Sequence, residues 1–280
     1  MKIERVIQHF NNAPDCFICP KCKQPVSQTE KSFICENRHC YDLSNKNYVN
    51  FAPSAKPTKY TADLFEARSA VLSGGFYTPV SDAILKMIKD ADQRQTILDA
   101  GCGEGYYSGQ IKARFPEADL FAMDLSKEAV ISTARHYPEL FAMVADLAHI
   151  PFKDHSVDIL LNILTPANYQ EFFRVLKPDG RLIKVIPGKD YLKEIRQALG
   201  EQIMNSSFSN EQVLTHIETH TRVIDHQTVH YTRPVTSEER QHFITMTPMT
   251  FNLEDKTTFD PDFESITIHL DLLVCQNPTP

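Results

Sequence analysis

No stretch of this sequence is apolar for long enough to cross a membrane. A membrane-spanning helix needs about 20 apolar residues, and no run of even about 18 occurs here. Residues 1–14 also lack the apolar segment of a secretory signal. We therefore expect a cytoplasmic protein whose thiols stay reduced. Tryptophan is absent too, and this absence excludes no class of function.

Internal repeats and low-complexity tracts are also missing from the 280 residues. A chain of this length is long for one domain and suits a small module followed by a larger domain. Residues 51–60 are punctuated by prolines and lack apolar periodicity, which is typical of a linker. We expect a module with its linker at residues 1–60 and a larger domain at residues 61–280.

Positive charge is scarce over most of the chain. The net charge is −7 at pH 7, which disfavours a general nucleic-acid binder. Residues 1–60, however, carry nine Lys and Arg against five Asp and Glu, which leaves −11 for the remaining 220 residues. A basic module on an acidic chain is the footprint of an RNA-facing part. An ordinary solvated basic face has the same composition.

A glycine-rich turn is the most informative motif. Residues 97–107 read Ile-Leu-Asp-Ala-Gly-Cys-Gly-Glu-Gly-Tyr-Tyr, which predicts a strand, a turn and the start of a helix. Glycine permits positive φ and a close approach of the backbone to a ligand. The next apolar run ends in Asp124, 25 positions after Asp99, where an acid can hold a ribose diol. The motif predicts a nucleoside site in a doubly wound α/β sheet.

This turn lacks the fingerprint of a dinucleotide site. Pyrophosphate binding at a helix N-terminus uses Gly-x-Gly-x-x-Gly, whereas residues 101–105 read Gly-x-Gly-x-Gly. Asp99, just before the turn, would repel a pyrophosphate and suits a cationic ligand. The pattern argues against a nicotinamide or nucleotide-sugar oxidoreductase. It resembles motif I of the class I S-adenosylmethionine-dependent methyltransferases.

Further segments extend that resemblance in the order and spacing of the same family. Asp146 follows an apolar run and looks like the acid that meets the adenine amino group. Residues 157–162 read as a buried parallel strand, and residues 172–183 resemble the helix, turn and strand written R-x-L-K-P-G-G. Residues 221–231 and 265–274 look like the antiparallel hairpin that completes such a sheet.

Five of the seven cysteines fall within the first 40 residues. Cys19 and Cys22 form a C-x2-C pair, and Cys35 and His39 follow, after twelve residues, as C-x3-H. At this spacing three thiolates and an imidazole can close a tetrahedron around one zinc ion. Four protein ligands leave no open position, so the metal would be structural.

Two other ligand sets fit the same stretch. Cys16 with Cys19 could form the first pair, and Cys40 could replace His39 in the second. A disulfide is the competing interpretation, but the absence of a secretory signal favours reduced thiols and a metal.

Together these parts resemble the RlmA-type 23S rRNA (guanine-N1)-methyltransferases over nearly the whole chain. The matching residues are spread along the sequence, at 19–22, 35, 38–39, 48–50, 67–68, 77–79, 99–107, 124–127, 135–138, 151–152, 165–166, 187–188 and 246–248. The chain departs from the family pattern in its first 15 residues, in Asp179 where glycine is usual, and in Tyr191 where histidine is expected.

The resemblance implies an S-adenosylmethionine-dependent rRNA (guanine-N1)-methyltransferase. It implies a Rossmann-like class I methyltransferase sheet at residues 61–280 and a small zinc-binding ribbon module for RNA recognition at residues 1–60. The implied zinc ligands are Cys19, Cys22, Cys35 and His39. The implied cofactor contacts are Tyr77, Asp99, Gly101, Gly103, Glu104, Asp124, Asp146 and Tyr191. Capping a helix or closing a turn is the alternative role of Asp124 and Asp146.

The implied substrate is a hairpin of 23S rRNA, and no membrane partner is expected. A guanine methylated at N1 has to be unpaired or swung out of a stem. Its N1 proton must leave, so a polar group near residues 162–166 would help, with Thr165 as a positioning candidate and no catalytic residue identified. The alternative function is a class I methyltransferase for another RNA or a small molecule. A homodimer is left open.

Overall fold

A mixed sheet runs through the molecule and carries both parts of the chain. The computed structural model describes residues 2–54, 61–88, 94–200, 210–251, 253, 259 and 261–278. Within these residues, eleven strands follow the order β1-β2-β3-β4-β7-β6-β5-β8-β9-β11-β10. Their bounds are β1 Val26–Gln28, β2 Ser32–Cys35, β3 Cys40–Ser44, β4 Tyr48–Asn50, β5 Thr96–Ala100, β6 Asp119–Asp124, β7 Phe141–Val144, β8 Val157–Ile163, β9 Leu176–Pro187, β10 Arg222–Pro234 and β11 Ser265–Gln276.

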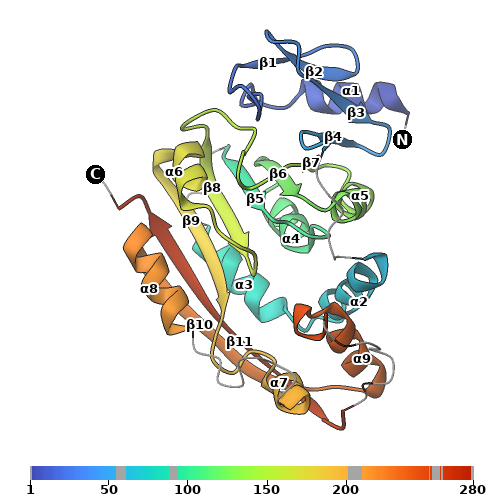
Figure 1. Cartoon of the computed structure of the whole chain (residues 1–280), viewed down its shortest axis with the longest axis vertical. Helices are drawn as coiled ribbons and strands as arrows, with labels where there is room; N and C mark the ends of the chain where they lie inside the picture. The colour runs from blue at the N-terminus through green and yellow to red at the C-terminus, as the bar shows by residue number, and fades with distance from the viewer. Residues whose placement is uncertain are drawn as a thin grey trace.

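Helices lie on both sides of this sheet (Figure 1). Their bounds are α1 Ile3–Asn11, α2 Ala62–Ser73, α3 Thr78–Met87, α4 Tyr106–Arg114, α5 Lys127–His136, α6 Tyr169–Val175, α7 Lys193–Leu199, α8 Glu211–His220, α9 Ser237–Met246 and the 3-10 helix η2 Pro248–Thr250. None of the helices in the described ranges is long and apolar enough to span a membrane.

The central strands are buried on both faces, as parallel strands are. β5 pairs in parallel with β6 and with β8, and β6 pairs in parallel with β7. Successive side chains point to opposite faces, so Ile97 packs in one apolar layer and Leu98 in the other. The first layer includes residues of α3, α4, α7 and α9, and the second includes residues of α1, α6, α8 and the N-terminal strands. The sequence prediction of a buried parallel strand at 157–162 is confirmed by β8.

The predicted hairpin is confirmed and is longer than the sequence indicates. β10 and β11 pair antiparallel from Arg222 opposite Gln276 to Pro234 opposite Ser265. β11 also pairs antiparallel with β9, so the hairpin extends the sheet beyond β9. The turn predicted at Gly180 falls within the bounds of β9, at an irregularity of its register. Leu176 pairs with Val157 and Arg181 with Ile159, so residues 177–180 lie opposite a single residue of β8.

The helix boundaries follow local signals. Thr61 accepts the N–H of Leu64 and caps α2, and α3 begins with Pro79 in its first turn. Gly74 ends α2, and its N–H donates to the carbonyl of Ala70. α7 begins at Lys193, directly after Leu192, which takes a left-handed conformation with φ of 51°.

The N-terminal strands join the sheet that contains β5 to β11 and do not form a detached unit (Figure 1). β4 pairs in parallel with β7, and Phe17 forms a bridge with Phe152. The ring of Phe17 also contacts those of Phe121 and Phe51. Phe51, expected as the first linker residue, is only 3% exposed and belongs to this core. Residues 55–60 of the predicted linker lie outside the described residues.

A buried ion pair fastens α6 to both parts of the chain. Glu171 accepts two hydrogen bonds from Arg174, at 2.7 and 2.8 Å, and one from the backbone N–H of Ile150 at 2.8 Å. Lys23 of the N-terminal part lies 3.4 Å from the same carboxylate. Burial acts to raise the pKa of Glu171, but the hydrogen bonds and charge of Arg174 hold this pKa below its ordinary value.

We predict that Glu171→Gln destabilises the fold. Loss of hydrogen bonds to charged groups should lower the free energy of unfolding at pH 7 by about 1.5–3 kcal/mol, measured by urea unfolding. The folded-state pKa is depressed, so the contribution is present above the ordinary pKa of 4.5 and is lost as pH falls through the folded value. Glu218→Gln, at an exposed position of α8, is the control. Equal losses in the two variants would contradict the assignment.

Candidate functional site

The glycine-rich turn lies at the carboxyl edge of the sheet, between β5 and α4. The backbone N–H groups of Gly101 and Cys102 donate to the carbonyl of Met123, at 2.8 and 2.9 Å. These bonds join the ends of β5 and β6. The strand order reverses between β5 and β8, and ligands of such sheets bind in the crevice at that point. Gly105, the N-cap of α4, has φ of 81°, and a Cβ there would meet Thr133 at 2.7 Å. Glycine is therefore required at this position.

Asp124, at the end of β6, organises the same turn. One carboxylate oxygen accepts the N–H of Gly103 at 3.0 Å, and the other accepts the N–H of Ser126 at 2.8 Å. Burial raises the pKa of Asp124, while these two backbone donors lower it. The turn-closing role expected as an alternative is therefore present in the structure, whereas Ser126 is the residue that caps α5. The side chain of Asp124 is only partly buried.

Three carboxylates gather around the turn. Asp99 is 1% exposed and accepts a hydrogen bond from the hydroxyl of Ser108 at 2.6 Å. Burial raises the pKa of Asp99 to about 7, and the charges of Asp124 and Glu104 add to the rise. Such a site repels a pyrophosphate and attracts a cation. These residues fit the sulfonium and ammonium groups of S-adenosylmethionine.

Glu104 and the two tyrosines form a second cluster beside the turn. The hydroxyls of Tyr77 and Tyr191 are 2.7 Å apart. Arg68 Nε lies 3.2 Å from a carboxylate oxygen of Glu104, and neither oxygen of Glu104 has a hydrogen-bond partner among the described residues. A buried carboxylate with unused acceptors is available to a donor on a ligand.

Asp146 is placed differently from the other acids. It follows β7, is exposed, and accepts the N–H of Ala148 at 2.9 Å, which closes a turn. The turn-closing alternative for Asp146 is thus observed.

A cavity of about 690 Å³ opens beside the tyrosines. Its polar lining includes Arg68, Tyr77, Tyr107, Lys184, Tyr191 and His216, and no carboxylate lines it within the described ranges. Thr165 also lines the cavity and packs on the glycine turn, where a Cβ at Gly101 would meet its methyl carbon at 2.6 Å. The cavity therefore adjoins the expected cofactor turn.

Sequence reasoning gave no functional role to Arg68 and did not single out Tyr107 or Lys184. One sequence signal could have indicated Lys184: it is the single charged residue within the apolar run of β9. Burying a cation costs free energy, so a lysine in such a run suggests a functional role. Arg68 belongs to a segment that matches the family, but no spacing rule places it opposite Glu104.

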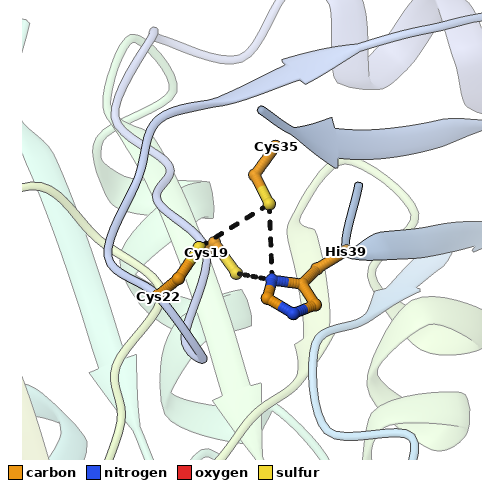
Figure 2. A group of neighbouring side chains, drawn as sticks. All are labelled: Cys19, Cys22, Cys35 and His39. Atoms are coloured by element: carbon orange, nitrogen blue, oxygen red, sulfur yellow. Dashed lines mark hydrogen bonds between the residues drawn. The ribbon is translucent and has the colours of Figure 1, made fainter. Parts of the chain in front are cut away.

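The N-terminal strands bring three cysteines and one histidine together (Figure 2). Cys22 Sγ lies 3.7 Å from Cys35 Sγ, and His39 Nδ1 lies 3.3 Å from Cys19 Sγ and 3.5 Å from Cys35 Sγ. With zinc–sulfur and zinc–nitrogen bonds of about 2.3 and 2.0 Å, the edges of a tetrahedral site measure about 3.5–3.8 Å. The four atoms fit a zinc ion.

Neither alternative ligand joins this cluster. Cys16 is buried and lies outside the group of Cys19, Cys22, Cys35 and His39, whose ligand atoms are within 4.8 Å of one another. Cys40 is exposed, and its thiol lies 3.6 Å from a carboxylate oxygen of Asp42.

Both parts of the chain match families of known proteins. Residues 17–58 match the family model described as RlmA, N-terminal, and residues 97–180 match the one described as Methyltransferase domain. A Bacillus subtilis protein named "Putative 23S rRNA (guanine-N(1)-)-methyltransferase YxjB" is 36% identical, over 92% of this chain and 96% of its own. The 23S rRNA (guanine(748)-N(1))-methyltransferase of Streptomyces fradiae is 33% identical, over 65% of this chain and 67% of its own.

Among solved structures, the YcgJ protein of Bacillus subtilis is 16% identical, with a TM-score of 0.49, over 71% of this chain and 98% of its own. The relative that spans nearly the whole chain, together with the ribbon and methyltransferase models, decides the family. The chain belongs to the RlmA-type 23S rRNA (guanine-N1)-methyltransferases.

Proposed function

We propose that the protein transfers the methyl group of S-adenosylmethionine to N1 of a guanine in 23S rRNA. The observation that carries the proposal is a ribbon of RlmA type, with a metal-competent Cys3His cluster, in one chain with a methyltransferase sheet. We further propose that the enzyme acts in the cytoplasm on an RNA hairpin. A homodimer is compatible with this function.

The cofactor contacts that we propose are those expected from the sequence. Asp124 would hold the ribose, Asp99 the methionine amine and Asp146 the adenine, with Gly101 and Gly103 beneath the ligand. Tyr77, Glu104 and Tyr191 would complete the methionine end beside the cavity. The sulfonium supplies an already activated methyl group, so the protein chiefly aligns the guanine and excludes water.

The module at residues 1–60 is proposed to hold one structural zinc ion through Cys19, Cys22, Cys35 and His39 and to contact RNA. The domain at residues 61–280 is proposed to carry out methyl transfer. Lys21 and Arg38 are exposed on the two cysteine-containing loops, which supports an RNA-facing role. Lys23 lies against Glu171, so it is less available to a phosphate.

Purified protein should contain about one zinc per chain, and Cys19→Ser should lose it. A serine hydroxyl does not replace a thiolate in a structural zinc site. Cys16→Ser and Cys40→Ser are the matched controls and should keep the metal, measured by elemental analysis. Retention in Cys19→Ser with loss in either control would shift the ligand set.

Asp124→Ala should weaken S-adenosylmethionine binding at least tenfold by titration calorimetry. Hydrogen bonds to a charged group contribute about 1.5–3 kcal/mol, and about 1.4 kcal/mol corresponds to a factor of ten. Asn50→Ala, which removes the side-chain acceptor of the Ala52 N–H at the end of β4, outside the proposed cofactor contacts, measures how much a disturbed strand-end turn alone costs. Unchanged affinity in Asp124→Ala would show that the ribose contact is misassigned.

Mass mapping of 23S rRNA from cells with and without the gene tests the proposed function. We expect one N1-methylguanosine to disappear, and its restoration by purified enzyme and S-adenosylmethionine. In a separate binding titration at several salt concentrations, Lys21→Gln/Arg38→Gln should weaken RNA binding and reduce its log–log salt slope by roughly 0.7–0.9 per lost phosphate contact. Lys86→Gln/Arg114→Gln, exposed on α3 and α4, is the control. An unchanged methylation pattern would reject the function.

A further inference from the structure

Guanine N1 carries a proton that has to leave as the methyl group arrives. The cavity beside the cofactor turn offers no carboxylate base among the described residues that line it. Its tyrosines are poor bases, because burial raises the pKa of Tyr77, Tyr107 and Tyr191 and keeps their phenols protonated. The lining groups that can be neutral amine or imidazole bases are Lys184 and His216.

Lys184 is the buried member of this pair. It lies on β9, is 4% exposed and lines the cavity. Its Nζ donates to the side-chain oxygen of Asn162 and to the carbonyl of Thr165, the latter at 2.7 Å. His216, by contrast, is exposed on α8. A neutral amine has two N–H groups, which match these two acceptors and leave its lone pair for a third partner.

The surroundings of Lys184 favour the neutral amine. Burial lowers the pKa of Lys184 to about 8, and it makes no salt bridge with a carboxylate of the described residues. Cys275 on β11 acts on Lys184 electrostatically, but burial raises the pKa of its thiol, which stays uncharged near neutrality. Besides the three tyrosines named above, the titratable groups that line the cavity are Tyr169 on α6, His216 on α8, Arg68 on α2 and Arg196 on α7.

The contacts of Lys184 also connect the cofactor turn with the loop of residues 162–166. The carbonyl of Thr165 accepts the hydrogen bond from Lys184, and the side chain of Thr165 packs on Gly101 of the cofactor turn. Asn162 donates to the carbonyls of Ala100 and Pro166, both at 3.1 Å, and so ties the end of β5 to residues 162–166. The amine of Lys184 is therefore held where the cofactor turn meets the loop of residues 162–166.

We propose that Lys184, as the neutral amine, is the general base that accepts the N1 proton of the target guanine. The inference rests on the proposed function. The N–H electron pair becomes the N1 lone pair and forms the bond to the methyl carbon, while the methyl–sulfur bond breaks and its pair stays on sulfur. The proton forms the lysine ammonium, which releases it to water after the product leaves.

Single-turnover methylation of a 23S rRNA fragment tests this assignment. The wild-type rate should rise with pH and level off above about 8, because the amine must be deprotonated. Lys184→Arg keeps a donor but cannot be a base, and it should lower the rate at pH 8 by about 10²–10⁴-fold. Binding of S-adenosylmethionine should stay unchanged. Lys177→Arg, on the same strand and paired with Asp158, is the control.

A second variant separates the chemical role from a structural one. Lys184→Ala should lose the pH-dependent limb, and added methylamine should restore part of the rate with the pH dependence of the added amine. A limb near pH 8 that persists in either variant, or failure of amine rescue, overturns the assignment. Loss of the limb in His216→Gln alone assigns the base to His216. Failure of the wild type to form N1-methylguanosine rejects the proposed function instead.

Discussion

The close contact between Gly101 and Thr165 is the constraint on which the site depends. The two residues belong to segments that follow different strands, and a side chain at position 101 would meet Thr165 at 2.6 Å. The cofactor turn and the loop of residues 162–166 can therefore occupy their places only together. Lys184 and Asn162 also fix that loop, because their side chains donate hydrogen bonds to the carbonyls of Thr165 and Pro166. Methyl transfer needs a fixed distance between donor and acceptor, since misplacement of about 1 Å can cost roughly a hundredfold in rate.

The electrostatics of the site follow from the same arrangement. Asp99, Glu104 and Asp124 concentrate negative charge at the turn, while the neighbouring cavity is lined by tyrosines and basic groups and by no acid of the described residues. This division suits a positively charged ligand at the turn and an uncharged ring in the cavity. Under the proposed function these would be S-adenosylmethionine and the target guanine.

Much of this could be predicted from sequence, because the signals are local. The glycine turn, the parallel strand before Asn162 and the β10–β11 hairpin each follow from periodicity and turn chemistry within a few residues. The zinc cluster has the same character, since its spacing already limits the geometry. The individual cofactor contacts stay predictions.

What could not be predicted depends on contacts between distant residues. Phe51 is predicted as the start of a linker but packs against Phe17. The turn predicted at Gly180 lies within β9, at an irregularity of its register opposite β8. Nothing in the order of residues reveals that Lys184 reaches Thr165, 19 positions away, or that Lys23 meets Glu171, 148 positions away. Tertiary packing decides such contacts, and local propensity carries no information about them.

The pairing of β4 with β7 fixes the position of the N-terminal strands relative to the strands that end at the cofactor turn. Paired strands run from β2, which ends at Cys35, and β3, which follows His39, to the strands that end at the cofactor turn. Along these described strands the metal cluster and the cofactor turn belong to one sheet. An RNA arm seated on the cysteine-containing loops would present its guanine at a set reach from the methyl donor. The enzyme would then select its target by the length and bend of the RNA as well as by the identity of the base.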